Sequence, residues 1–158
     1  MPGTRGEKET ARVAGFYLLI LAVLIFDQLT KFWAVSFLPS RESFVLVRGI
    51  LHLTLVYNAG IAFGFFRGHQ NLLLILISIS LAFLFFGGRR VHSSKRPLDW
   101  ALALILGGAL GNWIDRIRFG AVIDFLDFRI WPVFNLADSA ITIGVFFYVA
   151  ALFKKKAA

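Results

Sequence analysis

Four long apolar blocks constrain the fold of this chain more than any other feature of its sequence. A helix of ~20 apolar residues crosses ~30 Å of hydrocarbon, and helices are favoured in lipid because they satisfy their own backbone polar groups. Hydrophobic residues form 58% of the 158 residues, above the ~45–50% of ordinary soluble domains. We therefore predict one integral membrane domain over residues 1–158, with four transmembrane helices. The expected spans are about 13–38, 72–86, 98–113 and 136–153.

The first block follows a basic tail, so a cleaved signal peptide is its rival interpretation. Signal peptides have a short apolar core followed by a small-residue cleavage site. The block over 13–38 is too long for such a core, and no clear cleavage site precedes its polar interruption at Asp27–Lys31. We therefore expect this block to remain in the protein as a membrane helix.

Basic residues are concentrated at one set of span ends. They gather in the N-terminal tail, in the connection over 89–96 and in Lys154–Lys156, whereas the other connections carry fewer for their length. Cytoplasmic loops of membrane proteins carry the excess of Lys and Arg, so we predict that both termini are cytoplasmic. The same distribution accounts for the net charge of +8, and we expect no nucleic-acid partner.

The region over about 43–68, between the first two blocks, has a different character. Apolar and polar residues alternate up to residue 57, with a turn signal at Arg48–Gly49, which is typical of two short β-strands. The apolar run over 61–66 is typical of a segment that lies in the membrane interface. The predicted fold is an all-α membrane protein of four transmembrane helices, with a small extracytoplasmic β-platform and an interfacial helical segment.

The residue types present exclude several chemistries. The chain has no cysteine, which excludes disulfides, thiolate nucleophiles and zinc–thiolate sites. Its three histidines are far apart in sequence and form no ligand spacing such as HExxH. We therefore expect neither a metal ion nor a cofactor.

Charged residues at membrane depth cost at least ~2.5–3.5 kcal/mol each on insertion scales, so they are functional candidates. Asp27 and Lys31 are four positions apart and share one helix face. We favour an ion pair that stabilises the helix end over a direct catalytic role for these two. A Ser–Lys hydrolase would also need a serine nucleophile, and no serine in the sequence is marked as one.

The end of the third block combines small and polar residues. Gly107 and Gly111 form a small-xxx-small pair, which lets a neighbouring helix approach closely. Gly108, Asn112 and Asp115 continue a polar stripe near that face, and Arg116 follows it. For Asn112, Asp115 and Arg116, scaffold and functional roles are equally open.

Two aspartates follow, on either side of a turn signal at Trp131–Pro132. Asp124 interrupts an apolar stretch. Asn135 is the expected N-cap of the fourth helix, which places Asp138 near the positive end of the helix dipole. Two carboxyls in a low-dielectric site share one proton, so such a pair can activate a water and protonate a leaving amine.

The residues alone leave the function open. An aspartyl hydrolase and a proton- or ion-coupled channel are equally compatible with buried carboxylates, although the almost entirely apolar inner halves of the spans disfavour a channel. A lipid-binding structural protein is a third alternative, and it would tolerate replacement of the aspartates. We interpret the neighbouring Asp127 as a surface ion pair with Arg129 or Arg118.

Several segments together resemble one family, the bacterial lipoprotein signal peptidases, also called signal peptidase II. The segments occur in the family's order from the first block into the fourth, and together they are far more specific than any one alone. They are DQLTKFW (27–33), NAGIAFG (58–64), GGALGNWIDR (107–116), VIDF (122–125) and WPVFNLADSA (131–140).

The resemblance implies a metal-free aspartyl protease of the bacterial cytoplasmic (inner) membrane, with its active site toward the outer face. Its partners would be membrane lipids and its substrates prolipoproteins whose cysteine carries diacylglycerol, cut just before that cysteine. Asp124 and Asp138 match the family's catalytic aspartates, and we expect a monomer. The positions that match substrate contact or site support are Asn58, Gly60, Asn112, Arg116 and Asn135. Three further residues match family positions whose role is less defined: Asp27, Lys31 and Asp115.

Overall fold

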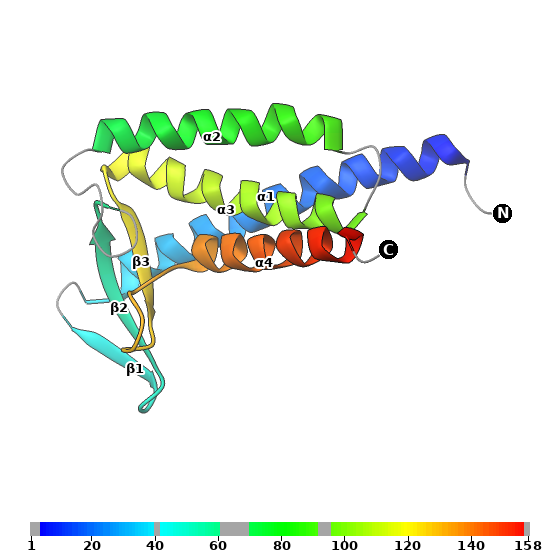
Figure 1. Ribbon diagram of the computed structural model, residues 1–158. Helices are drawn as coiled ribbons and strands as arrows, with labels where there is room; N and C mark the ends of the chain where they lie inside the picture. Colours follow the sequence, from blue (N-terminus) through cyan, green and yellow to red (C-terminus); the bar gives the residue numbers. More distant parts are fainter. Residues whose placement is uncertain (1–3, 40–41, 61–69, 92–95, 157–158) are drawn as a thin grey trace.

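The computed structural model of the protein describes residues 4–39, 42–60, 70–91 and 96–156. Within these ranges four helices run alongside one another, and a three-stranded sheet lies at one end of them (Figure 1). The start of the first helix and the end of the last both lie at the opposite end. The helices are α1 (Arg5–Phe37), α2 (Gln70–Val91), α3 (Arg96–Phe119) and α4 (Leu136–Lys156), and the strands are β1 (Ser43–Val47), β2 (Leu51–Asn58) and β3 (Val122–Asp127).

Helix α1 begins earlier than the apolar block that predicts it. Thr4 is its N-cap: Glu7 N donates to Thr4 Oγ1 over 3.4 Å, and Thr4 N donates to Glu7 Oε2 over 2.6 Å. This capping box satisfies backbone donors at the helix start, so the polar tail joins the helix. The helix ends at Phe37 because Leu38, which precedes Pro39, is extended.

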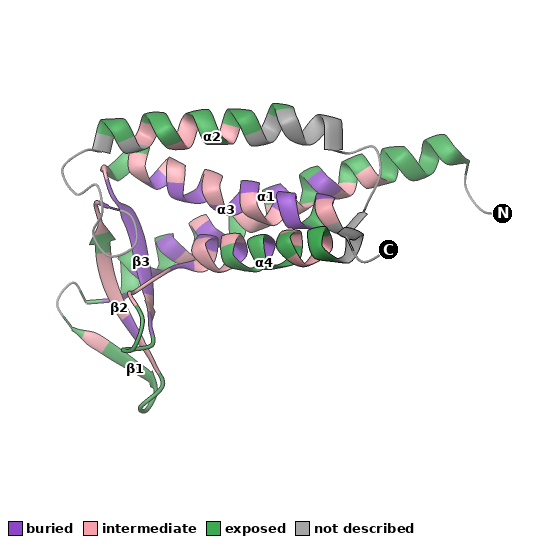
Figure 2. Ribbon diagram, in the orientation of Figure 1, coloured by how far each residue is buried: buried purple, intermediate pink, exposed green. Residues whose placement is uncertain are grey.

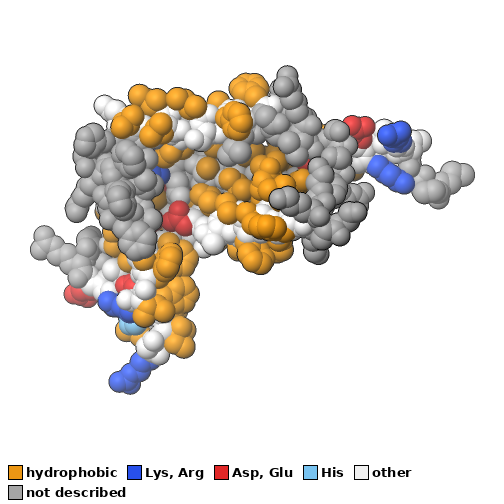
Figure 3. Space-filling view, viewed as in Figure 1, with side chains coloured by type: hydrophobic (Ala, Val, Ile, Leu, Met, Phe, Trp, Pro, Cys, Tyr) orange, Lys and Arg blue, Asp and Glu red, His pale blue; other side chains and the backbone are white. Residues whose placement is uncertain are grey.

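All four predicted blocks are helical, and two of the helices are long and apolar enough to cross a membrane by length and composition. These are α1 and the Leu136–Phe153 part of α4. Helix α2 contains a shorter apolar stretch, Leu74–Phe83, in a search that covered only the described residues. Much of the helical surface is exposed (Figure 2), and apolar side chains gather on it (Figure 3). Phe32 is 72% and Phe83 75% exposed. Such large exposed apolar surfaces are typical of regions that a membrane or a partner covers.

Helix α3 is the centre of the bundle and packs on α1, α2 and α4. Glycines permit the closest approaches between the helices. A Cβ on Gly107 would lie 2.8 Å from Val23 Cβ on α1, and a Cβ on Gly144 of α4 would lie 2.7 Å from the carbonyl oxygen of Ala101 on α3. The predicted packing role of Gly107 is therefore confirmed.

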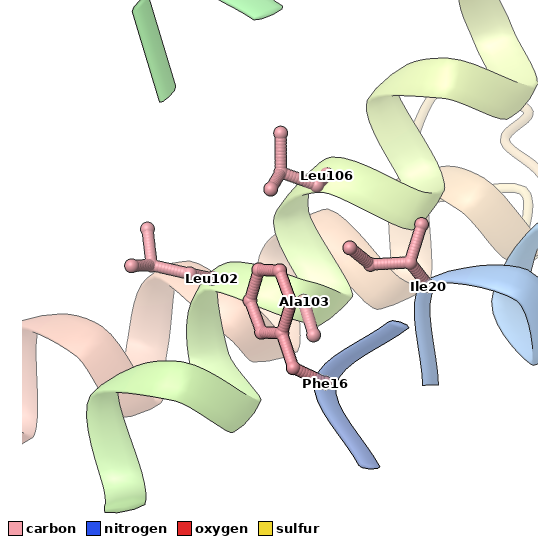
Figure 4. Packing of buried hydrophobic residues seen from close by; sticks show 5 residues of the cluster. All are labelled: Phe16, Ile20, Leu102, Ala103 and Leu106. Atoms are coloured by element: carbon pink, nitrogen blue, oxygen red, sulfur yellow. The ribbon is translucent and has the colours of Figure 1, made fainter. Parts of the chain in front are cut away.

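An apolar cluster fills the interface of α1 and α3 in the half of the bundle away from the sheet (Figure 4). Its buried members are Phe16 and Ile20 from α1 and Leu102, Ala103 and Leu106 from α3. Where lipid surrounds helices, such contacts stabilise the bundle through close packing rather than through removal of apolar surface from water.

The sheet has the strand order β1–β2–β3, and both neighbouring pairs are antiparallel. The turn between β1 and β2 contains Gly49 at φ +77°, where the sequence predicts a turn and where a residue without a Cβ is favoured. Leu53 on β2 and Phe125 on β3 pack with Ala34 and Leu38 at the end of α1. This second apolar cluster fixes the sheet to the bundle.

Strand β3 is the main difference from the predicted fold. The alternation in the sequence predicts two strands, and the segment that carries Asp124 is predicted only as an apolar connection. In the structure Asp124 lies opposite Val56 of β2 within the sheet. Most of β3 is buried, and a strand buried on both faces lacks the polar–apolar alternation that identifies a half-exposed strand. The interfacial segment expected over 61–66 lies outside the described residues.

Candidate active site

Strand β3 places Asp124 against the end of the bundle, where the residue is only 1% exposed. Asn58 Nδ2 donates to Asp124 Oδ2 over 3.0 Å, and Asn135 Nδ2 donates to Asp124 Oδ1 over 2.7 Å. Burial is the main cause that raises the pKa of Asp124 to about 7; the charge of Asp138 also raises it, and the two amide donors oppose the increase. Asp124 therefore keeps its proton up to a much higher pH than a solvated aspartate.

Helix α4 carries Asp138 in its first turn. Asp138 N donates to Asn135 Oδ1 over 2.8 Å, and Asn135 N donates to Asp138 Oδ2 over 3.4 Å. These reciprocal bonds make Asn135 the N-cap of α4, as the sequence predicts. They also hold the Asp138 carboxyl at the end of the helix where the backbone dipole favours negative charge.

Two asparagine side chains connect the aspartates. Asn112 Nδ2 on α3 donates to Asp138 Oδ1 over 2.7 Å. Asn135 Nδ2 lies 3.0 Å from Asn112 Oδ1 and 2.7 Å from Asp124 Oδ1. The carboxyls of Asp124 and Asp138, fourteen positions apart in the sequence, are thus joined by a bridge of two amides.

A cavity of about 440 Å³ lies beside both carboxyls. Part of its wall is apolar and comes from the connection over 131–134 and from Ile141 on α4. Its volume falls in the range of ligand-binding pockets. A second cavity, of about 290 Å³, lies near the start of α1 and is not lined by either aspartate. The larger cavity brings together Asn58, Gly60, Asn112, Arg116, Asp124 and Asp138, all of which the sequence nominates.

Arg116 anchors the backbone at the edge of this cavity. Its Nη2 donates to the Gly60 carbonyl oxygen over 2.9 Å, and Asn58 Oδ1 accepts a hydrogen bond from Gly60 N over 3.1 Å. Asn58 therefore holds the end of β2 with one side-chain atom and Asp124 with the other. Among the described residues, no group of three His, Cys, Asp or Glu side chains is placed to hold a metal ion.

Comparison with known proteins identifies the family. The family model for signal peptidase (SPase) II matches residues 19–154. The chain belongs to the signal peptidase II family. The lipoprotein signal peptidase of Moorella thermoacetica is 47% identical over 131 residues, which cover 82% of this chain and 87% of the relative. The lipoprotein signal peptidase of Halothermothrix orenii is 40% identical over 140 residues, which cover 89% of this chain and 96% of the relative.

A solved structure extends this similarity to the fold. A bacterial membrane enzyme determined by the in meso method at 1.9 Å resolution is 34% identical to the chain and superposes with a TM-score of 0.80. The match covers 90% of this chain and 94% of that one. As a member of the signal peptidase II family, the chain is a peptidase, and it shares its mostly helical fold with a membrane enzyme.

Asp27, Lys31 and Asp115 lie behind the cavity rather than in its wall. Lys31 Nζ is 2.8 Å from Asp27 Oδ2 and 2.7 Å from Asp115 Oδ2, and all three side chains are at most 1% exposed. The predicted Asp27–Lys31 pair is therefore present, with Asp115 as a third member. In this signal peptidase II family member, the three charges form a buried cluster between α1 and α3.

Gln28 also belongs to this cluster, although it is not among the candidate residues predicted from the sequence. Gln28 Nε2 lies 3.0 Å from Asp115 Oδ1, 3.3 Å from Asp27 Oδ2 and 3.3 Å from the Gly111 carbonyl oxygen. A signal was available, because Gln28 lies within the first segment that resembles the family. A glutamine next to an aspartate on a helix does not, however, reveal which side chain of another helix it meets.

Asp127 differs from its predicted surface position. It pairs with Arg129 at 3.6 Å as predicted, but it is only 6% exposed and also accepts a hydrogen bond from Thr54 Oγ1 over 2.8 Å. Burial alone would raise the pKa of Asp127, but the bonds from Thr54 and the Arg129 backbone, with the Arg129 charge, hold it below its usual value. Asp127 thus stabilises the β2–β3 pair, away from the cavity.

Proposed function

We propose that this chain is an intramembrane-type aspartyl endopeptidase that removes the signal peptide from diacylglyceryl-modified prolipoproteins by cutting before the lipidated cysteine. The observation that carries this proposal is that Asp124 and Asp138 line one cavity and are linked through Asn135. The relatives' name, lipoprotein signal peptidase, supports the substrate class.

Asp138 acts as the base and Asp124 as the acid. The ionised Asp138 takes a proton from a water in the cavity while the water oxygen bonds to the scissile carbonyl carbon. Asp124, with a pKa of about 7, gives its proton to the carbonyl oxygen. Asp124 then takes back a proton from a hydroxyl of the tetrahedral intermediate, and Asp138 protonates the amide nitrogen as the C–N bond breaks. One water is consumed, and both carboxyls return to their starting states.

The location of the cavity fits a lipidated substrate. It lies where the sheet meets the bundle, at the end away from the start of α1 and the end of α4. We place this end at the outer face of the bacterial cytoplasmic membrane, with four spanning helices and cytoplasmic termini. The acyl chains of the substrate then stay in the bilayer, while the peptide bond before the cysteine reaches the interface at the depth of the carboxyls.

The packing of α1 and α3 disfavours the channel alternative. Arg12 and Asp99 form an ion pair near the start of α1, whereas Asp27 and Lys31 pair at its other end. The apolar cluster of Figure 4 lies between these two polar regions. A hydrated path for ions between them would have to pass through this packed apolar layer, which is costly.

The test uses purified enzyme in lipid nanodiscs with a diacylglyceryl prolipoprotein. Asp124→Asn and Asp138→Asn should each lower kcat by roughly 10²–10⁴-fold, the usual contribution of a positioned acid or base. Asp127→Asn is the matched control, because it makes the same change on β3 outside the cavity, and its kcat should stay within about threefold. Full activity of either cavity variant would remove that aspartate from the mechanism.

A second test addresses the metal-free part of the proposal. Because the two carboxyls supply both proton transfers, extended dialysis against EDTA should leave kcat unchanged. Re-addition of Zn²⁺, Mg²⁺ or Mn²⁺ should not increase it. A loss of activity in EDTA that one of these metals restores would contradict the mechanism, even if Asp124→Asn and Asp138→Asn are inactive.

A further inference from the structure

Lys31 lies in the interior of the bundle with all of its hydrogen-bonding capacity used. Its ammonium contacts Asp27 Oδ2 at 2.8 Å, Asp115 Oδ2 at 2.7 Å and Asn112 Oδ1 at 2.9 Å. An ammonium group has three donors and no acceptor, so these three partners satisfy it. The side chain does not line the cavity, so Lys31 has no direct contact with a substrate there.

Two of the three partners lead to the segments that carry the aspartates. Asp27 Oδ1 accepts a hydrogen bond from Ala137 N over 3.0 Å, and Ala137 is the residue before Asp138. Asp115 Oδ2 accepts one from Ile123 N over 3.2 Å, and Ile123 is the residue before Asp124. Lys31 therefore holds, through one carboxylate each, the backbone next to both aspartates.

The third partner, Asn112, is oriented by Lys31 together with Asn135, whose Nδ2 donates to the same Asn112 Oδ1 atom over 3.0 Å. Because the ammonium only donates, the Asn112 side chain must turn its oxygen toward Lys31 and its NH₂ group away. That NH₂ group then donates to Asp138 Oδ1 over 2.7 Å. With the amide turned over, two donors would face each other at Lys31, and the amide oxygen would face the carboxylate of Asp138. The direction of the Lys31–Asn112–Asp138 chain is thus fixed by chemistry, and at its end Asp138 is an acceptor.

We propose that Lys31 is the positioning residue that assigns Asp138 its role as the base. Through Asn112 it aims a donor at Asp138, and through Asp27 and Asp115 it sets the positions of both aspartates. This inference rests on the proposed function, since it explains which of two otherwise similar carboxyls carries the charge. A carboxylate that accepts directed hydrogen bonds is stabilised in its ionised form. Asp124 also accepts two amide hydrogen bonds, but its burial outweighs them.

Other charged groups also act on this part of the site, and the test must allow for them. Arg116 on α3 interacts electrostatically with Asp138, Asp124 and Asp115, and Asp124 on β3 interacts with Asp138 and Lys31. These groups remain in place when Lys31 is replaced. A change in the pH profile of a Lys31 variant therefore reports the loss of Lys31 rather than a loss of all charge at the site.

The first variant is Lys31→Met, which keeps the length of the side chain and removes its charge and donors. We expect kcat to fall at least about 100-fold, KM to stay within about threefold, and the acidic limb of the kcat–pH profile to move to higher pH. Arg12→Met is the matched control, because it breaks an ion pair that also joins α1 and α3, with Asp99 at the far end of the bundle. Its kcat and pH profile should match those of the wild type.

Lys31→Met leaves two buried carboxylates unpaired, which destabilises a fold strongly. The triple variant Asp27→Asn, Lys31→Met, Asp115→Asn removes all three charges and keeps acceptors for Ala137 N and Ile123 N. It should fold and show the same low kcat and shifted acidic limb, because Asn112 Oδ1 loses its charged donor and keeps only the neutral hydrogen bond from Asn135 Nδ2. A folded single or triple variant with wild-type kcat and an unchanged pH profile would overturn the proposal.

These outcomes are separate from a failure of the proposed function. If wild-type enzyme does not cleave the diacylglyceryl substrate, or if Asp138→Asn cleaves it normally, the proposed function fails. If wild-type enzyme is active and Asp138→Asn is inactive, but the Lys31 variants behave as wild type, only the role of Lys31 fails.

Discussion

Asn135 donates a hydrogen bond from Nδ2 to Oδ1 of Asp124 over 2.7 Å and so ties the start of α4 to the middle of β3. Its Oδ1 atom meanwhile accepts the hydrogen bond from Asp138 N that caps the helix. One buried side chain therefore holds a helix terminus and a carboxyl of the site with different atoms. An amide is suited to this position because it has both a donor and an acceptor.

Asn135→Ser should separate these two tasks. Serine is as good an N-cap as asparagine, so the cap of α4 should remain. The free energy of unfolding should still fall by about 1–3 kcal/mol, because the buried acceptors of Asn135 Nδ2 lose their donor. The serine hydroxyl cannot cap α4 and also reach Asp124, so kcat should fall at least about 10-fold. Asn135→Ala should lose kcat and be about 1 kcal/mol less stable than Asn135→Ser, because it also removes the cap. Unfolding in detergent and initial rates measure the two effects, and wild-type kcat in Asn135→Ser would contradict the second task.

The pKa of Asp124 predicts the alkaline limb of the pH profile. As the acid, Asp124 must carry its proton, and its pKa is about 7, so kcat should decline above about pH 7, approaching tenfold per pH unit. The hydrogen bond from Asn58 favours the ionised form of Asp124 and lowers its pKa. Asn58→Leu should therefore move the alkaline limb to higher pH, as measured by kcat from pH 5 to 9. A limb that moves to lower pH, or stays in place, would contradict this assignment.

Some elements of the fold can be predicted because the pattern that identifies them is local in the sequence, whereas others depend on tertiary contacts. The four helices are local features, since long apolar runs identify them, and the hairpin of β1 and β2 shows in its alternation and in Gly49. Strand β3 has no such signal, because its partner and its burial on both faces come from the tertiary structure. Similarly, the capping box of Thr4 and Glu7 extends α1 beyond its apolar block.

The contacts of the candidate site likewise include some that the local sequence predicts and others that depend on helix packing. Asn135 and Asp138 are linked by a cap that is visible over three positions of sequence. The ion pair of Lys31 and Asp115, by contrast, joins two helices. Packing sets the rotation of each helix about its axis, for example where Gly111 of α3 approaches the Asp27 carboxyl of α1. The sequence predicts that these residues are buried and polar, but only the packed bundle shows which of them meet.

Helix spacing at Gly108 should control the position of Asp138. A Cβ on Gly108 would collide with the carbonyl oxygen of Ala137 and lie 2.9 Å from Ile141 Cγ1, so Gly108→Ala should push α4 away from α3. We expect a loss of about 1–3 kcal/mol from overpacking and a clear fall in kcat. Gly15→Ala is the matched control, because nothing lies within 4 Å of its Cβ position on α1. The control should be neutral or stabilising by up to about 1 kcal/mol, and equal effects of both changes would contradict the close contact.

Asp124 should make stability depend on pH in a direction opposite to that of most paired aspartates. Its pKa is about 7 in the folded protein and about 3.9 in an unfolded chain. Between these values the folded state binds a proton that the unfolded state has released, so stability should fall as pH rises from about 4 to 7 and then level off.

The variant Asp124→Asn removes this titration and keeps a polar side chain between the two asparagine donors. The midpoint of thermal unfolding in detergent should therefore fall from pH 5 to pH 8 in the wild type more than in Asp124→Asn, by the equivalent of about 1.4 kcal/mol for each pH unit between pH 5 and 7. Asp127→Asn should keep the wild-type slope, because the pKa of Asp127 lies below its usual value and the group stays ionised throughout this range. If the unfolding midpoints of wild type and Asp124→Asn change equally with pH, the Asp124 carboxyl does not hold a proton near neutral pH.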